Sequence, residues 1–163
     1  MKSYICSFAV VALMLIGVGC HTQELSQLYG GRLDILANHD RAEAFRVRAS
    51  ADSPATQPML TSDLSIIAGP VALNPQQTRD LSKSLARQQT YFWDLVRLCD
   101  SPPEIAVRFW KGSESLTVAF PSSAENINVF IGHQSTGSQT LYEEPAVMEQ
   151  VISIFFPKPS GSR

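Results

Sequence analysis

Residues 105–120, IAVRFWKGSESLTVAF, decide the fold that we expect for this chain. Apolar side chains occupy every second position before a Lys-Gly-Ser-Glu turn and again after it. Because side chains in a strand alternate between its two faces, this spacing predicts two short strands joined by a tight turn. Ile105, Val107 and Phe109 would share the buried face of the first strand. The stretch therefore predicts an antiparallel hairpin with one apolar face.

The same alternation recurs on both sides of this hairpin. Ile127, Val129 and Ile131 predict a third strand, and three consecutive strands with short polar turns are typical of an antiparallel meander. Upstream, Glu43–Ala49 alternates as a half-exposed strand does, with Phe45 on its buried side. Polar stretches rich in proline or small residues predict loops. The further elements that we expect are a short strand at Leu64–Ala68 and loops at Ser50–Ser62 and Gly132–Gln139.

Two other stretches predict helices. Asn74 can cap a helix that begins at Pro75, and Gln77 stands where a capping box requires Glu or Gln. Leu81 and Leu85 would lie on one face of this helix. The second helix begins after Pro145 and ends before Pro157, and its apolar stripe consists of Val147, Val151, Ile154 and Phe155.

The order of elements indicates the fold class. Antiparallel strands with helices gathered on one face form an α+β fold. We therefore predict a two-layer α+β domain in which an antiparallel β-meander carries two helices packed on one face. The residues that we expect in its core are Phe45, Leu81, Leu85, Val107, Phe109, Val118, Val129, Val151 and Phe155.

The first twenty residues predict export. Lys2 supplies a positive charge, and Ile5–Gly19 is an uncharged apolar run of fifteen residues that ends on small side chains. As a helix this run would span roughly 22 Å, which is short of the ~30 Å hydrocarbon core of a bilayer. We therefore expect residues 1–19 to be a cleaved signal peptide rather than a permanent membrane span.

Cys20 follows directly after Gly19, and this junction resembles the lipobox of bacterial lipoproteins. Such boxes usually carry Leu three residues before the cysteine, where this chain has Gly17, whereas Val18 and Gly19 fit. The resemblance implies acyl chains on Cys20, which would hold the protein at the cell envelope, on the outer membrane or the periplasmic face. The alternative is cleavage by ordinary signal peptidase, which would release a soluble secreted or periplasmic protein.

The mature chain would have the length of one domain and a small negative charge. Removing the first 19 of the 163 residues leaves 144 and takes away one lysine and no acid, so 12 basic residues face 15 acidic ones. A net charge of −3 offers no electrostatic footprint for nucleic acid, and we expect no such partner. We divide the chain into a signal peptide (1–19), a lipid anchor and tether (20–40), a single α+β domain (41–158) and a frayed tail (159–163).

The three cysteines argue against a disulfide framework. Cys6 would leave with the signal peptide and Cys20 would carry lipid, so Cys99 would remain as a lone thiol. A lone cysteine is most often a small buried hydrophobe, and neither His nor Lys adjoins Cys99 to activate it. If Cys20 is not lipidated, a pairing of Cys20 with Cys99 is the alternative.

One part of the chain resembles a loosely defined group of small bacterial envelope proteins. The similarity is carried by Tyr91-Phe92-Trp93, then Cys99, and then Pro103–Phe109. In that group a helix leads to a Tyr-x-Trp-like element, a cysteine, a proline and an Ala-x-Arg-Phe strand, and the chain often ends near a Phe-Pro such as Phe156-Pro157. The resemblance covers about residues 41–157. It implies the fold and the envelope address but no activity.

Little in the sequence points to a metal site. Many members of that group carry Cys-x-x-Cys near the end of the second meander strand, but this chain has Ala119 and Ser122 there. His39 and Asp40 with nearby Asp34 are three metal-ligating residue types, but zinc sites need three or four ligands at defined spacings. A solvated approach to the first strand is the better interpretation. We therefore expect no metal and no cofactor.

The candidates for catalysis are equally sparse. His133 and Ser135 lie in a Gly-bounded polar segment, but neither a Gly-x-Ser-x-Gly elbow nor a third member accompanies them. Glu143 and Glu144 form an acidic pair, but they precede Pro145 and suit the positive end of the last helix. These residues favour a protein that is not an enzyme. The alternative is a small secreted hydrolase or cell-wall-active enzyme that uses the His133 loop.

Arginines suggest a binding surface. By alternation, Arg46, Arg48 and Arg108 would point outward, and Trp110 would share a face with Arg108. If the strands are neighbours, these residues form a basic patch with an aromatic contact, a mixture that is enriched at protein interfaces. The alternative is a solvated sheet face whose Arg stems cover apolar surface. We therefore predict a non-enzymatic binding or inhibitory module that meets an envelope protein at the membrane surface, with an anionic small ligand as the alternative occupant of this patch.

Overall fold

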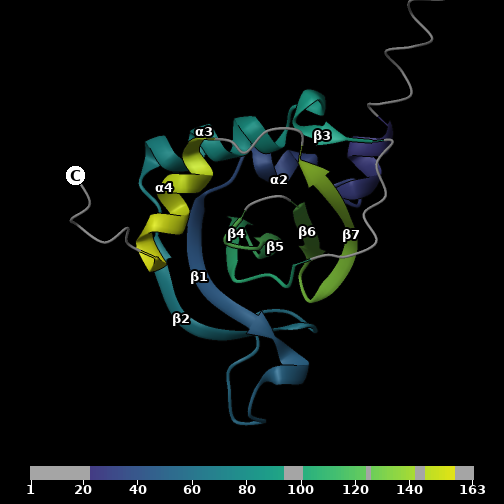
Figure 1. Ribbon diagram of the computed structural model, residues 1–163. Helices are drawn as coiled ribbons and strands as arrows, with labels where there is room; N and C mark the ends of the chain where they lie inside the picture. The colour runs from purple at the N-terminus through teal and green to yellow at the C-terminus, as the bar shows by residue number, and fades with distance from the viewer. Residues whose placement is uncertain (1–22, 94–100, 124–125, 142–145, 157–163) are drawn as a thin grey trace, which may run out of the picture.

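One antiparallel sheet organises the protein. The computed structural model describes residues 23–93, 101–123, 126–141 and 146–156, and the predictions on Cys20, Cys99 and Glu143–Pro145 lie outside these ranges. The seven strands of the described residues follow one another across the sheet in the order β2-β1-β4-β5-β6-β7-β3. They are β1 (Arg41–Ala49), β2 (Leu64–Ala72), β3 (Tyr91–Phe92), β4 (Ile105–Lys111), β5 (Glu114–Phe120), β6 (Asn126–Ile131) and β7 (Gln134–Leu141) (Figure 1).

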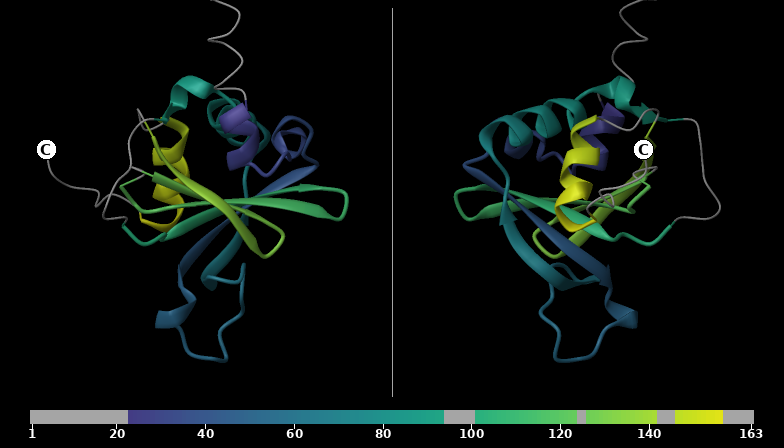
Figure 2. Two further views of the ribbon diagram at one scale, coloured as in Figure 1. Left: turned by 90° about the vertical axis from the view of Figure 1, so that its right-hand side faces the viewer. Right: turned by 60° about the vertical axis from the view of Figure 1, so that its left-hand side comes forward.

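The helices lie together on one side of this sheet (Figure 2). They are helical residues 23–28, α2 (Leu33–Ala37), α3 (Pro75–Leu85) and α4 (Ala146–Phe155), and the described residues also contain the 3-10 turns η1 (Ser50–Asp52) and η2 (Gln88–Thr90). All four helical segments contribute buried side chains to one hydrophobic core. The prediction of an antiparallel α+β fold is confirmed. The prediction of two helices is wrong in number, because residues 23–28 and α2 pack against the same core.

The predicted meander is confirmed in β4, β5 and β6. Val107 pairs with Val118, and Val118 pairs with Val129. Residues that pair across neighbouring strands point to the same face, so these three valines form a row, and each is fully buried beneath the helices. Burying such a row stabilises the sheet by roughly 1.5–3 kcal/mol for each side chain.

Helix α3 begins at the predicted capping box. The side-chain oxygen of Asn74 accepts hydrogen bonds from the backbone N–H groups of Gln76 at 3.0 Å and Gln77 at 2.9 Å. The side-chain oxygen of Gln77 in turn accepts from the N–H of Asn74 at 3.2 Å. These reciprocal bonds satisfy donors that have no partner inside the helix, so the helix can start at Pro75.

The prediction of a loop at Gly132–Gln139 is wrong, because β7 begins at Gln134. This strand pairs with β6 along its length, although its residues are mostly Ser, Thr, Gly and Gln. β7 also contacts the N-terminal segment, where the hydroxyl of Thr136 donates to the carbonyl of Leu28 at 2.9 Å. A polar strand of this kind is held by its neighbours, and its own sequence contains no apolar alternation to reveal it.

The segment that the sequence assigned to a tether is largely part of the core. Leu25, Leu28, Tyr29, Ile35 and Leu36 are each at most 7% exposed, and all belong to the main hydrophobic cluster. The packed part of the chain therefore extends from residue 41 back to at least residue 25.

A second, smaller core lies on the opposite face of the sheet. The connection between β1 and β2, residues 50–63, which we call the arm, folds back so that Leu60 is fully buried. The second core consists of Phe45, Val47, Leu60, Leu64, Ala106, Ala119 and Phe130. Phe45 is buried as predicted, but in this second core, whereas Phe155 packs against the main core and is only partly buried. Where the arm covers the sheet, both faces of β1 are shielded from water, so Phe45 can be buried without facing the helices.

Candidate functional site

The four predicted binding residues do not form one patch. Arg46 pairs with Ile105 of the main core, so its side chain lies on the helix side of the sheet. Arg108 pairs with Glu43 and lies two positions from Ala106 of the second core, so it lies on the opposite side. The expected continuous surface is therefore divided by the sheet itself.

Arg108 fastens the arm to the sheet. Its guanidinium donates hydrogen bonds to the backbone carbonyl of Leu60 and, at 3.0 Å, to the hydroxyl of Thr117. Burial lowers the pKa of Arg108, and the negative charge of Glu43 opposes that shift. An arginine retains its charge in either case. Since Nε and one terminal nitrogen donate within the protein, Arg108 has a structural role in holding the arm.

Trp110 belongs to the same cluster. Its indole N–H donates to Oε2 of Glu43 at 3.2 Å. The guanidinium carbons of Arg41 and Arg108 lie 4.8 Å and 5.5 Å from its ring centroid, within the range of cation–π attraction. Arg41 also approaches Glu43, with Nε and Oε1 3.7 Å apart. The cluster therefore satisfies the indole N–H of Trp110 through Glu43 and covers its ring with two guanidinium groups.

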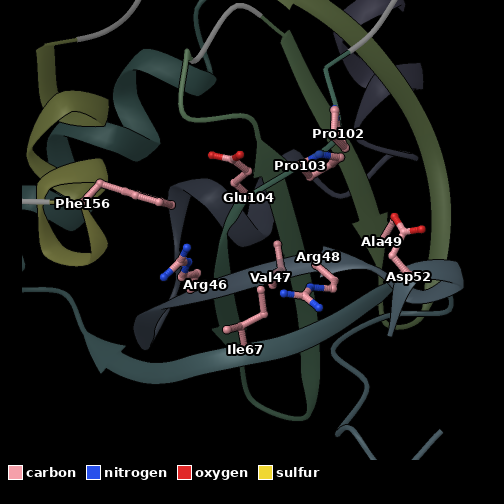
Figure 3. Close-up of a pocket in the computed structure, with 10 residues that line it drawn as sticks. All are labelled: Arg46, Val47, Arg48, Ala49, Asp52, Ile67, Pro102, Pro103, Glu104 and Phe156. Atoms are coloured by element: carbon pink, nitrogen blue, oxygen red, sulfur yellow. The ribbon is translucent and has the colours of Figure 1, made fainter. Parts of the chain in front are cut away.

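Arg46 and Arg48 line a separate pocket at the base of the arm, which we call the Arg46–Arg48 pocket (Figure 3). Its volume is about 240 Å³. In Figure 3 the two arginines stand on the β1 side, with Glu104 across from them and Phe156 of the α4 end at one flank. Asp52, Ile67, Pro102 and Pro103 are also among its lining residues.

The two arginines in this pocket are available to a ligand. The guanidinium carbon of Arg46 lies 4.6 Å from the ring centroid of Phe156, which orients its planar group. In the part of the chain that the structure describes, neither Arg46 nor Arg48 forms an ion pair. A guanidinium can bind a carboxylate or phosphate through two parallel hydrogen bonds. The pocket therefore combines anion-binding donors with an aromatic wall.

The carboxylates of Asp52 and Glu104 give the pocket both signs of charge. Such a lining suits a ligand that carries a negative group for the arginines and a positive or hydrogen-bond-donating group for the carboxylates. The sequence pattern does not reveal Asp52, Glu104 and Phe156 as neighbours of the arginines, because they come from three segments that only the fold brings together with β1.

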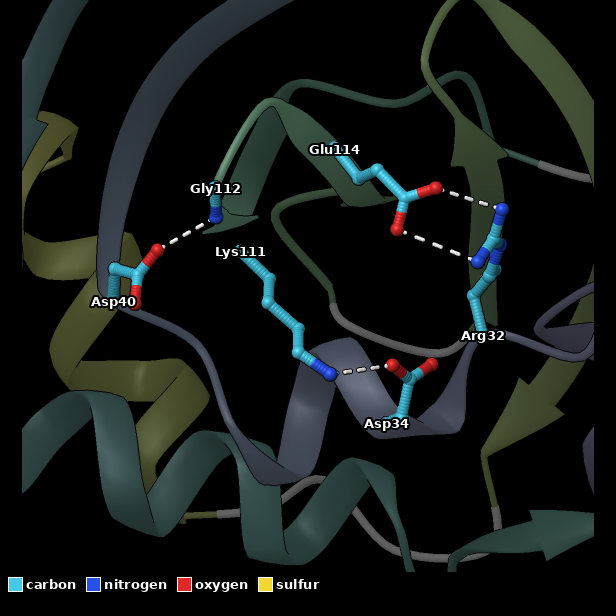
Figure 4. Close-up of polar contacts among 6 residues, drawn as sticks. All are labelled: Arg32, Asp34, Asp40, Lys111, Gly112 and Glu114. Carbon is cyan, nitrogen blue, oxygen red and sulfur yellow. Dashed lines mark hydrogen bonds and ion pairs between the residues drawn. The ribbon is translucent and has the colours of Figure 1, made fainter.

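Asp34 and Asp40, near the start of β1, hold the turn between β4 and β5 (Figure 4). Oδ2 of Asp34 lies 2.7 Å from Nζ of Lys111, and this hydrogen bond lowers the pKa of Asp34. Oδ2 of Asp40 accepts from the backbone N–H of Gly112 at 2.6 Å. These contacts clasp the β4–β5 turn. His39 contacts the Leu36 carbonyl through Nδ1 at 2.9 Å.

His133 and Ser135, the candidates for hydrolysis, both lie in the β6–β7 hairpin. His133 is exposed in its turn, and the backbone carbonyl of His133 accepts from the N–H of Ser62 in the arm at 3.0 Å. Ser135 lies in β7 and pairs with Phe130. The structure thus uses the backbone of this hairpin to attach the end of the arm.

Comparisons with known proteins add little. Among the residues that the structure describes, no helix is both long enough and apolar enough to cross a bilayer. No protein-family model matches the chain, and no curated protein matches it. A solved structure from Clostridium perfringens, described as a "putative lipoprotein", aligns over 82% of this chain and 97% of its own with a TM-score of 0.46 and 13% identity. That similarity is too distant to carry an argument.

Proposed function

We propose that this protein is an exported lipoprotein, anchored through Cys20, whose folded domain is a non-enzymatic binding module at the cell envelope. The observation that carries the binding role is the Arg46–Arg48 pocket. Two guanidinium groups without ion-pair partners among the described residues line this pocket, and that of Arg46 lies 4.6 Å from the ring centroid of Phe156. Arginine and aromatic side chains are enriched in protein interfaces, where they supply much of the binding energy.

The anchor is supported by the order of residues at the N-terminus. An apolar run too short to span a bilayer ends directly before Cys20. Acyl chains contribute about 0.8 kcal/mol of membrane affinity for each buried methylene, and two chains already hold a protein stably.

Intact mass spectrometry of membrane-extracted protein tests the anchor. We expect the wild type to begin at Cys20 and to carry lipid mass, and the Cys20→Ser variant to lack that mass. An unmodified wild-type chain cut after Gly19 would refute the anchor and leave a soluble exported protein.

The partner that suits the pocket is an envelope protein that presents a carboxylate beside a basic or hydrogen-bond-donating group. Such a ligand matches the arginines with its negative group and the carboxylates of Asp52 and Glu104 with the other. We expect the Arg46→Ala/Arg48→Ala variant to lose crosslinked envelope partners that the wild type retains.

The matched control is Arg79→Ala/Arg87→Ala, which removes the same charge from exposed positions of α3 and just beyond its end. This control should retain the partners, because the general electrostatic attraction changes equally in both variants. Equal crosslinking by the wild type and both variants would refute the pocket as the binding site.

A small anionic ligand is the second candidate for the same pocket. Its volume of about 240 Å³ is slightly below that of ordinary ligand sites, so a compact molecule would fit. Thermal shifts with carboxylates and phosphates distinguish this candidate. A shift that is lost in Arg46→Ala/Arg48→Ala but kept in the control favours the small ligand, whereas no shift together with a crosslinked partner favours the protein.

A further inference from the structure

The folded domain begins almost directly after Cys20. Leu25 and Leu28 of helical residues 23–28 are 4% and 7% exposed, so this segment is packed into the main core. Only His21 and Thr22 separate Cys20 from residue 23. Because an extended chain covers at most ~3.6 Å for each residue, residue 23 can lie no more than about 11 Å from Cys20.

The start of the described chain is fixed to one end of the sheet. The hydroxyl of Thr136 in β7 donates to the carbonyl of Leu28 at 2.9 Å. The hydroxyl oxygens of Tyr29 and Tyr91 in β3 lie 2.6 Å apart in the core. Residue 23 therefore cannot move independently of β3 and β7, and a short anchor at Cys20 would restrain the orientation of the whole domain.

The arm lies at the opposite end of the molecule. In both views of Figure 2, the start of the described chain is at the top and the arm projects from the bottom. Figure 1 shows the same separation, with β3 at the upper edge and the tip of the β1–β2 connection below. The two ends of the molecule would thus meet different surroundings.

We infer that the domain rests directly on the lipid bilayer, with the β3 end of its sheet toward the lipid and the arm directed away from it. This inference rests on the lipid anchor at Cys20 that is proposed above. The short connection sets the orientation, since a reach of at most about 11 Å keeps residue 23 close to the lipid surface that holds the acyl chains.

The side chains at the two ends agree with this orientation. Phe92 of β3 is 37% exposed, and an exposed apolar ring of this kind can bury itself in the boundary between lipid headgroups and acyl chains. The arm carries Asp52 and Asp63 and neither Lys nor Arg, so an anionic lipid surface offers it no attraction. The arm also contains Met59, which is 46% exposed and available to an envelope partner.

Labels at the two ends test this orientation. Gln89→Cys in η2 and Ala55→Cys in the arm place a thiol at an exposed position of each end, in a Cys99→Ser background. The lipidated protein is reconstituted in phosphatidylethanolamine–phosphatidylglycerol vesicles that contain a headgroup nitroxide lipid. A fluorophore is attached to each thiol. We expect the nitroxide to quench the fluorophore at residue 89 several-fold more strongly than the fluorophore at residue 55.

Intact mass measured on the same samples separates two kinds of failure. Equal quenching of the two labels, or stronger quenching at Ala55→Cys, in protein with lipid mass would overturn the orientation and leave the anchor intact. A chain without lipid mass would overturn the anchor and the orientation together.

An insertion provides the matched control. Ten Gly and Ser residues between Thr22 and Gln23 add a flexible connection of roughly 17 Å. We expect the difference between the two labels to decrease, because the domain can then rotate. An unchanged difference would overturn the role of the short connection in setting the orientation.

Discussion

The hydroxyl oxygens of Tyr29 and Tyr91 lie 2.6 Å apart in the core, where both approach the carbonyl of Leu85 at the end of α3. Tyr91 donates to that carbonyl at 2.6 Å, and the longer contact from Tyr29 is 3.3 Å. The last carbonyls of a helix have no partner inside the helix, so this pair caps α3. It joins the N-terminal segment to the end of α3 and to β3, which lie 56 and 62 residues further along the chain.

The tyrosine pair predicts a loss of stability at alkaline pH. Burial raises the pKa of both phenols above their ordinary value of about 10, and the neighbouring Tyr91 raises that of Tyr29 further. The folded protein therefore keeps protons that the unfolded chain releases. Its contribution to stability is complete below pH ~10 and decreases as the pH rises toward the folded-state pKa values.

Urea unfolding between pH 8 and pH 11 measures this effect. We expect the free energy of unfolding to fall with pH in the wild type and to fall less steeply in Tyr29→Phe/Tyr91→Phe. At pH 8, Tyr91→Phe should cost about 1–2 kcal/mol, because it removes the shorter bond to Leu85. A variant with the wild-type slope would contradict this account.

We expect that adding one methyl group at Gly69 lowers the free energy of unfolding strongly. Its φ of +106° is unfavourable for other residues, and an added Cβ would lie 2.8 Å from the backbone oxygen of Ala44. We expect Gly69→Ala to lower the free energy of unfolding by about 2–4 kcal/mol. Gly112→Ala is the control, since its φ is +58° with no atom within 4 Å of the added Cβ, and it should cost about 1 kcal/mol. Equal losses in urea unfolding would refute the role of the close approach.

Leu60 predicts that the arm contributes to global stability. The Leu60 side chain is fully buried in the second core, whereas the adjacent Met59 is 46% exposed. Leu60→Ala should lower the free energy of unfolding by about 2–4 kcal/mol, because it leaves a cavity. Met59→Ala should change it by less than ~0.5 kcal/mol. Chemical denaturation of both variants checks this, and a small loss for Leu60→Ala would show that the arm unfolds separately.

We expect the substitution of Arg108 by alanine to lower the stability of the fold, and the substitution of Arg48 to leave it nearly unchanged. Arg108→Ala leaves the Leu60 carbonyl without that donor and should cost about 1–3 kcal/mol. Hydrogen exchange should also become faster at the arm amides of Leu60 and Ser62. Arg48 is exposed, and Arg48→Ala should change stability by less than ~0.5 kcal/mol. Unchanged exchange in Arg108→Ala would show that other contacts suffice to hold the arm.

Much of the fold was predictable because its signals are local. The alternation around Val107 and Val118 identifies strands wherever apolar and polar residues contrast. The cap at Asn74 depends on residues within one turn of helix. The sequence of β7, which includes Ser135 and Ser138, does not alternate between apolar and polar residues. This strand forms because β6 pairs with it. The prediction of a loop there failed for that reason.

The candidate site was predictable only in part. Alternation correctly placed Arg46 and Arg48 on one side of their strand, because both flank Val47 of the second core. It could not place Arg108 relative to them, since that depends on how β1 and β4 pair. Phe156 joins the pocket only through the packing of α4.

The sequence by itself determined the antiparallel strands, the start of α3 and the apolar segment that ends before Cys20, because each depends on residues that are close together in the chain. Only the tertiary structure decided which face of β1 meets the helices and which meets the arm. Alternation defines two faces of a strand but does not identify what covers each one. Leu60 and Phe45 meet in the second core although they come from the arm and from β1, and the pairing of β1 with β4 places Arg46 and Arg108 on opposite faces.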